Sequence, residues 1–165
     1  MRDGGLKGFI LILTLVLASG CSLFAADDDA RVVFGESIDD VVIGDDKTQV
    51  VEKLGSPDGI MMGDFPGYVY EYMSGRHAGL RVAIWTAEGV RSVQAASPYE
   101  GSTSRGIGIG TARTRVHQTI GQPDYTTDKT AGGWRIDQYR FEANRFVVRY
   151  SDDEAILVES ISMMD

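Results

Sequence analysis

The feature that most constrains the fold is a pattern of capping and turn residues that occurs twice, 66 positions apart. The first copy runs from Ile43 to Asp58 and the second from Ile109 to Asp124. In each copy a glycine precedes a polar residue, apolar residues four apart follow, and a Gly-x-Pro-Asp turn ends the passage. Self-similarity at a fixed period is typical of a repeated structural unit. We therefore expect two copies of one unit, joined by a link over 97–103.

Each copy of the pattern predicts a helix of about nine residues. Asp45 and Thr111 are the expected N-caps, because their side chains can accept hydrogen bonds from the free amides of a first turn. Val50 and Leu54 lie four apart in the first copy and would share one face. A glycine and then a proline follow each helix, which suits a left-handed end that cannot resume.

Three strands are expected after each helix, over 68–72, 80–84 and 90–95 in the first copy and over 134–141, 146–150 and 156–163 in the second. Strict alternation marks one buried face, on which we place Leu80, Val82, Ile84, Phe146, Val148 and Tyr150. The sequence thus predicts an α+β fold of two tandem repeats. Each repeat is a short helix followed by a three-stranded antiparallel meander, with the helices packed on one sheet face.

The N-terminus has the parts of a secretory signal peptide: the positive charges of Arg2 and Lys7, an apolar run over 9–17, and small residues before Cys21. The position of this only cysteine favours cleavage between Gly20 and Cys21 and lipidation of Cys21, as in bacterial lipoprotein signals. Two alternatives stay open. The segment could be retained as a membrane helix, although its apolar run is short for one, or ordinary cleavage could leave a free thiol.

The expected organisation follows from these segments. Residues 1–20 are the signal peptide, 21–30 a lipidated acidic tether, 31–98 the first α+β repeat and 99–165 the second. The formal net charge of −8 argues against nucleic-acid binding and against electrostatic adhesion to anionic lipid, so the lipid anchor must supply the membrane attachment. We expect a bacterial cell-envelope protein, with the periplasmic side of the outer membrane as the favoured address.

The repeated motif resembles that of the small lipoproteins of the BamE (SmpA/OmlA) type. It consists of a glycine, a capping residue, a valine, Leu-Gly-x-Pro-Asp and an aromatic strand. Its duplication is similar to the tandem-repeat layout of the β-lactamase inhibitor protein. The resemblance covers most of residues 38–165. It implies an envelope lipoprotein built from this helix-and-meander unit.

No pattern of catalytic or cofactor-binding residues emerges. His77 and His117 are interpreted as surface residues, because no nucleophile and orienting acid are paired with them in a recognisable pattern. The glycines over 106–110 lack the phosphate-loop motif, and the acidic clusters lack calcium-loop spacing. Met61-Met62 and Met163-Met164 could offer thioethers to copper(I), but more simply fill space. We expect no enzyme activity, no cofactor and no metal.

Aromatic and arginine side chains remain as candidates for binding a partner. We predict that they share the outer sheet face and bind an envelope protein: Trp85, Arg81, Tyr99, Tyr139, Phe141, Arg145 and Arg149. An alternative is that Trp85 and Phe141 only cover the seam between the repeats. The expected function is a non-enzymatic protein-binding or assembly module. The alternative function is an inhibitor or sensor that binds a soluble envelope enzyme or a small ligand between the repeats.

Overall fold

The computed structural model describes residues 30–128, 133–142 and 144–162. The predicted signal peptide, Gly20, Cys21, nearly all of the tether and Met163-Met164 lie outside the described residues. In the part of the chain that is described, no helix has the length and apolar character needed to cross a membrane.

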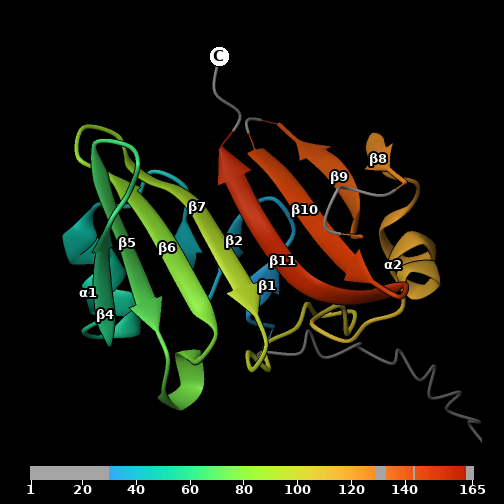
Figure 1. Cartoon of the computed structure of the whole chain (residues 1–165), viewed down its shortest axis with the longest axis horizontal. Coiled ribbons are helices and arrows are strands. Elements are labelled where there is room, and N and C mark those ends of the chain that lie inside the picture. The colour runs from blue at the N-terminus through green and yellow to red at the C-terminus, as the bar shows by residue number, and fades with distance from the viewer. Residues whose placement is uncertain (1–29, 129–132, 143, 163–165) are drawn as a thin grey trace, which may run out of the picture.

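An eight-stranded antiparallel sheet spans the molecule (Figure 1), with the strand order β4-β5-β6-β7-β11-β10-β9-β8. Its strands are β4 (Gly59–Met62), β5 (Gly67–Tyr72), β6 (Leu80–Trp85), β7 (Gly89–Ala96), β8 (Tyr125–Thr127), β9 (Arg135–Phe141), β10 (Asn144–Ser151) and β11 (Glu154–Ser162). β11, the last of the described strands in sequence order, therefore lies in the middle of the sheet, between β7 and β10.

The other elements of the described residues are two helices, α1 (Lys47–Leu54) and α2 (Arg113–Ile120), a 3-10 turn (Gly75–His77), and a small three-stranded sheet of β1 (Val32–Val33), β2 (Ser37–Ile38) and β3 (Val41–Val42). The small sheet lies behind the centre of the large one in Figure 1, where β2 and β3 contact β7. The chain is thus α+β, as predicted.

Each helix is followed by four strands of the large sheet, not by the three predicted. The additional strands, β4 and β8, are the two edges of the sheet. They are short, and Ile60, Met62 and Tyr125 on them are exposed. An edge strand that buries few side chains carries little of the alternating pattern by which strands are recognised.

The predicted N-caps are wrong by one residue in both helices. Asp46 caps α1 and accepts hydrogen bonds from the amides of Thr48 (2.7 Å) and Gln49 (2.9 Å), and these bonds lower its pKa. Asp45 is buried instead and pairs with Lys53. Ala112 is the N-cap of α2 and supplies no side-chain acceptor.

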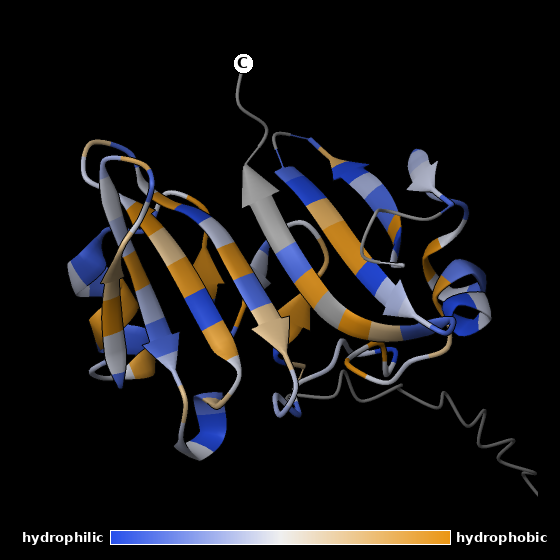
Figure 2. Cartoon of the chain, viewed as in Figure 1, coloured by the Kyte–Doolittle hydropathy of each residue, from blue (hydrophilic) through white to orange (hydrophobic). Residues whose placement is uncertain are grey.

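The predicted core is confirmed on the face that the helices cover, where the six residues named from alternation are each at most 4% exposed. Val50 and Leu54 from α1 and Val116 from α2 pack into the same cluster. Figure 2 shows the resulting alternation of apolar and polar residues along the strands.

Candidate binding face

The register places polar side chains next to one another across the face of the sheet opposite the core. Gln138, Val147, Glu159, Gln94 and Arg81 are successive partners on β9, β10, β11, β7 and β6. Directly paired residues point to the same side of a sheet, so these side chains form one row. Within the described chain no helix or strand covers this side, which faces the viewer in Figure 1. We call it the open face.

Glu159 is a nearly buried carboxylate in the middle of the open face. Its residue is only 7% exposed, and Oε1 accepts a hydrogen bond of 2.7 Å from Nε2 of Gln94. Burial raises the pKa of Glu159, while the hydrogen bond from Gln94 and the nearby charges of Arg149 and Arg145 oppose part of that rise. The carboxyl group therefore holds its proton more tightly than an exposed glutamate does.

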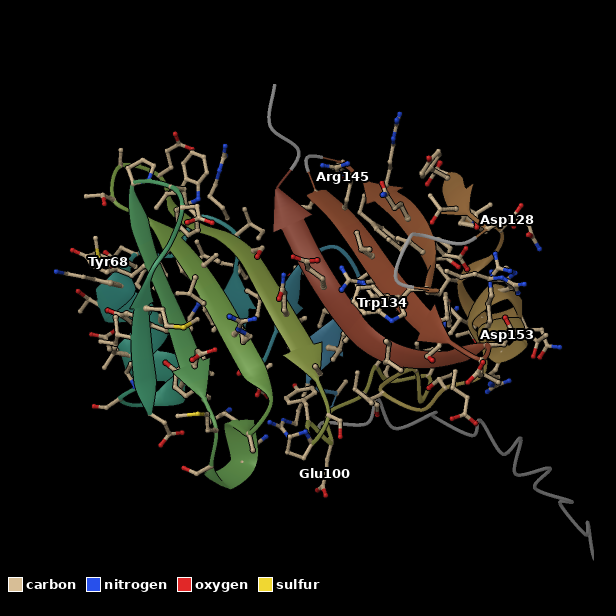
Figure 3. The ribbon with its side chains drawn as sticks, viewed as in Figure 1. Tyr68, Glu100, Asp128, Trp134, Arg145 and Asp153 are labelled. Carbon is tan, nitrogen blue, oxygen red and sulfur yellow. The ribbon has the colours of Figure 1, made fainter. Side chains whose placement is uncertain are left out.

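Arg145 and Arg149 extend from β10 on either side of this row. The guanidinium carbon of Arg149 lies 4.7 Å from the ring centroid of Trp134. Arg145 makes one long hydrogen bond, 3.5 Å from Nη1 to Oε1 of Gln138. The Nε atoms of both arginines are buried and have no hydrogen-bond partner among the described residues. Figure 3 shows Trp134 in front of β10, with Arg145 toward one end of the strand.

A second aromatic and cationic group lies at the β6 end of the open face. Trp85 stacks on Phe65 with 5.4 Å between ring centroids, and Arg91 lies 5.2 Å above the Trp85 ring. Arg81 pairs with Glu71 at 3.0 Å from Nε to Oε1. Four predicted partner-binding residues thus share this face, as expected: Trp85, Arg81, Arg145 and Arg149.

The other three predicted partner-binding residues are on the covered side, so their expected placement is wrong. Tyr99 and Tyr139 are each 3% exposed and belong to the core, and Phe141 packs against that core beside Phe34. Tyr139 pairs with Phe146, which fixes it on the inward side of β9. Phe141 contacts Phe34 of the first predicted repeat on the covered side, whereas Trp85 lies on β6 and stacks on Phe65, so the two residues are on opposite faces of the sheet.

Two charged clusters that were not predicted lie on the covered side. In the first, Asp39 is 7% exposed and accepts hydrogen bonds from Nη2 of Arg31 at 2.6 Å, and its Oδ2 lies 2.7 Å from Nδ1 of His77. Arg31 also lies 4.7 Å above the Tyr99 ring. The cluster therefore joins the start of the described chain to the turn after β5.

The second cluster is centred on Asp137, which is fully buried on β9. Arg113 donates from Nε and Nη2, at 2.9 and 2.8 Å, and His117 Nε2 and Thr126 Oγ1 each lie 2.7 Å from a carboxylate oxygen. Burial alone would raise the pKa of Asp137, but these hydrogen bonds outweigh it and lower the pKa to about 2. Asp137 thus stays ionised and attaches α2 to the sheet.

Both histidines are therefore partners of buried carboxylates, not the plain surface residues expected. A catalytic triad also needs a nucleophile on the imidazole. Among the described residues, no hydroxyl group hydrogen-bonds to His77 or His117, and the hydroxyl of Thr126 is directed to Asp137. The geometry of both clusters is that of structural ion pairs between distant segments.

Comparison with known proteins finds no matching family model and no matching curated protein. Solved structures do match. An extracellular protein containing an SCP domain from Bacillus anthracis has a TM-score of 0.58 and 13% identity, covering 80% of this chain and 49% of that one. A DUF4309 family protein, YjgB from Bacillus subtilis, has a TM-score of 0.58 and 13% identity, covering 78% and 88%.

A cysteine-rich secretory protein from Staphylococcus aureus matches with a TM-score of 0.54 and 13% identity, covering 73% of this chain and 43% of that one. The chain thus spans about half the length of the B. anthracis protein. Such identities establish likeness of fold alone. They overturn the resemblance to BamE-type lipoproteins and the β-lactamase inhibitor protein, because the fold matches SCP-associated and DUF4309 structures.

Proposed function

We propose that this chain is a lipid-anchored, non-enzymatic binding module that presents the open face of its sheet to a partner protein outside the cytoplasm. The observation that carries the proposal is a sheet face that no described helix or strand covers. It holds Trp85, Trp134 and several arginines, the residue types that contribute most to binding energy at protein interfaces. A sheet face that only contacts solvent would not need two tryptophan rings stacked with arginines.

The location in the proposal rests on two supports. The first is the sequence around Cys21, which favours lipidation. The second is that two proteins with this fold are an extracellular protein of B. anthracis and a secretory protein of S. aureus. The periplasmic side of the outer membrane stays our favoured address, and separation of inner and outer membrane fractions would test it.

The two-repeat organisation belongs to the same proposal. Each helix precedes four antiparallel strands, and equivalent backbone hydrogen bonds occur in both halves. The backbone amide of Asp58 donates to the carbonyl of Glu71, and the backbone amide of Asp124 donates to the carbonyl of Gln138. We infer that 31–98 and 99–165 descend from one unit, and that joining β7 to β11 doubled the width of the sheet.

In-cell photo-crosslinking tests the function. A photoreactive amino acid at Ser92, which pairs with Ala83 and Ile161 on the open face, should give a discrete crosslinked product. The same label at Glu52, an exposed residue of α1, is the control and should not give that product. Trp85→Ala should weaken capture at position 92 without altering the thermal midpoint. Absence of a product specific to position 92 would refute the proposal.

The alternative function is an inhibitor or sensor that binds a soluble envelope enzyme or a small ligand. For a small ligand it makes a different prediction. A hollow lined by Phe34, Ile43, Arg140 and Phe141 lies between the small sheet and the β9–β10 turn. A ligand bound there would raise the thermal midpoint of the full chain without any need for the open face. Phe34→Ala would remove that response while leaving the crosslink at Ser92 in place.

A further inference from the structure

Two half-buried arginines on the open face have unused hydrogen-bonding capacity. The other half-buried arginines of the described chain each pair with a carboxylate at 3.0 Å or less: Arg31 with Asp39, Arg91 with Glu88, Arg113 with Asp137 and Arg135 with Asp153. Arg145 and Arg149 pair with none within 4.0 Å among the described residues. A guanidinium group has five N–H donors, and among the described residues the only hydrogen bond of these two groups is the one from Nη1 of Arg145 to Gln138.

The nearby carboxylate does not neutralise these arginines. Among the described residues, Glu159 forms no ion pair with either arginine: its short hydrogen bond is to Gln94, and burial raises its pKa. Partial burial of a cation without a counter-ion costs free energy, and an anion supplied by a partner can remove that cost. Arg145 and Arg149 therefore form a positively charged centre in a protein whose formal net charge is −8.

From this charge complementarity we infer that the open face binds an acidic segment of a partner protein, with its carboxylates received by Arg145 and Arg149. The inference rests on the proposed function and specifies the partner. Guanidinium groups bind carboxylates through two parallel hydrogen bonds, and the Trp134 ring holds Arg149 in place from one side. The same ring gives the segment an apolar surface to pack on.

The surroundings favour a peptide over an anionic polymer. The row of side chains that crosses β10 between the two arginines contains the amides of Gln94 and Gln138 and the apolar Val147. Amides can hydrogen-bond to peptide groups, and an apolar residue suits aliphatic side chains. A polyphosphate would need a longer run of cations, and the acidic body of the protein would repel it. Polymer binding is therefore the competing outcome of the test.

The probe is a fluorescein-labelled octaglutamate peptide, titrated against the full-length protein in detergent and followed by fluorescence anisotropy. Arg145→Gln and Arg149→Gln should each weaken binding about tenfold, because each removes a charge-assisted pair. Arg115→Gln removes an exposed arginine of α2 and should leave binding unchanged. Arg149→Lys should retain part of the affinity, which separates loss of charge from loss of folding.

Three outcomes would overturn the inference: no binding of octaglutamate by the wild type, equal binding by wild type and both glutamine variants, or binding of polyphosphate alone. Its failure can be told apart from failure of the proposed function. If crosslinking from Ser92 persists in Arg145→Gln and Arg149→Gln, the binding module stands and only the acidic partner is wrong. If Ser92 captures nothing, the module is wrong, whatever the peptide does.

Discussion

Gln94 donates a hydrogen bond of 2.7 Å to Glu159, and this bond crosses the central seam of the sheet, where β7 meets β11. The two residues are 65 positions apart. The bond therefore connects the halves of the chain at the surface where the proposed partner would bind.

Glu159→Gln should make the protein more stable at neutral pH. The folded-state pKa of Glu159 is raised, so below the unfolded-state pKa both states are protonated and no penalty exists. Stability then falls as pH rises from the unfolded-state to the folded-state pKa, because the carboxyl ionises freely in the unfolded chain and keeps its proton in the folded one. Glutamine keeps an acceptor for Gln94 and cannot ionise. Thermal midpoints from pH 3 to 8 should show this fall in the wild type and not in the variant. Glu71→Gln, in the more exposed pair with Arg81, is the control and should not flatten the curve.

The contribution of Asp137 to folding stability should change with pH in the opposite direction. Its folded-state pKa is lowered from 3.8 to about 2, so its contribution is present above the unfolded-state value and is lost as pH falls through that interval. Asp137→Asn should remove this acid-sensitive part and, by leaving Arg113 without its carboxylate, should cost about 3 kcal/mol at pH 7. Asp153→Asn breaks the exposed pair with Arg135 and should cost less than about 1 kcal/mol. Urea unfolding of both variants would measure the difference, and equal losses would contradict the role given to Asp137.

Gly79 and Gly75 form a matched pair for testing the hairpin between β5 and β6. Both have positive φ angles, +92° and +65°. A Cβ atom at Gly79 would meet the carbonyl oxygen of Ala96 and the amide of Tyr99, whereas at Gly75 nothing lies within 4 Å. Gly75→Ala should cost about 1 kcal/mol from backbone strain alone, and Gly79→Ala should cost at least about 2 kcal/mol more because backbone must move. Similar losses in urea unfolding would argue against the close approach at Gly79.

Cys21→Ser should release the protein from the membrane fraction and abolish incorporation of labelled palmitate. The serine hydroxyl cannot replace the thiol that is lipidated, and the acidic chain has no electrostatic attraction to anionic lipid. Ser22→Ala, one residue further on, is the control and should stay membrane-bound. Retention of Cys21→Ser in the membrane after a carbonate wash would instead favour an uncleaved membrane helix.

The sequence predicted the parts of the fold that depend on neighbouring residues. Leu80, Val82 and Ile84 alternate along one strand, and that local pattern alone places them in the core. Local patterns do not show which sheet edges meet, because the pairing of β7 with β11 joins residues far apart in the chain.

Two of the three errors at the candidate site, those at Tyr139 and Phe141, have the same physical cause. Asp137 points toward the core although it is charged. If its charge is taken to mark the outer face of β9, then Tyr139 and Phe141, which alternate with it, are assigned to the outer face too. Only the hydrogen bonds from Arg113 and His117 on α2 make that burial favourable. Alternation in one strand does not reveal a charge that is compensated from another element. Arg145 and Arg149 were placed on the correct face, because β10 has no buried charge on its core side and its alternation is regular.

The position of β11 also sets a requirement on protein synthesis. Because this final strand fills the gap between β7 and β10, a chain that stops before Glu154 would leave two inner strands with unpaired edges. Such edges are templates for aggregation and targets for proteases. The sheet is therefore closed only in a chain that includes β11, and a product shortened before this strand would expose two unpaired inner edges.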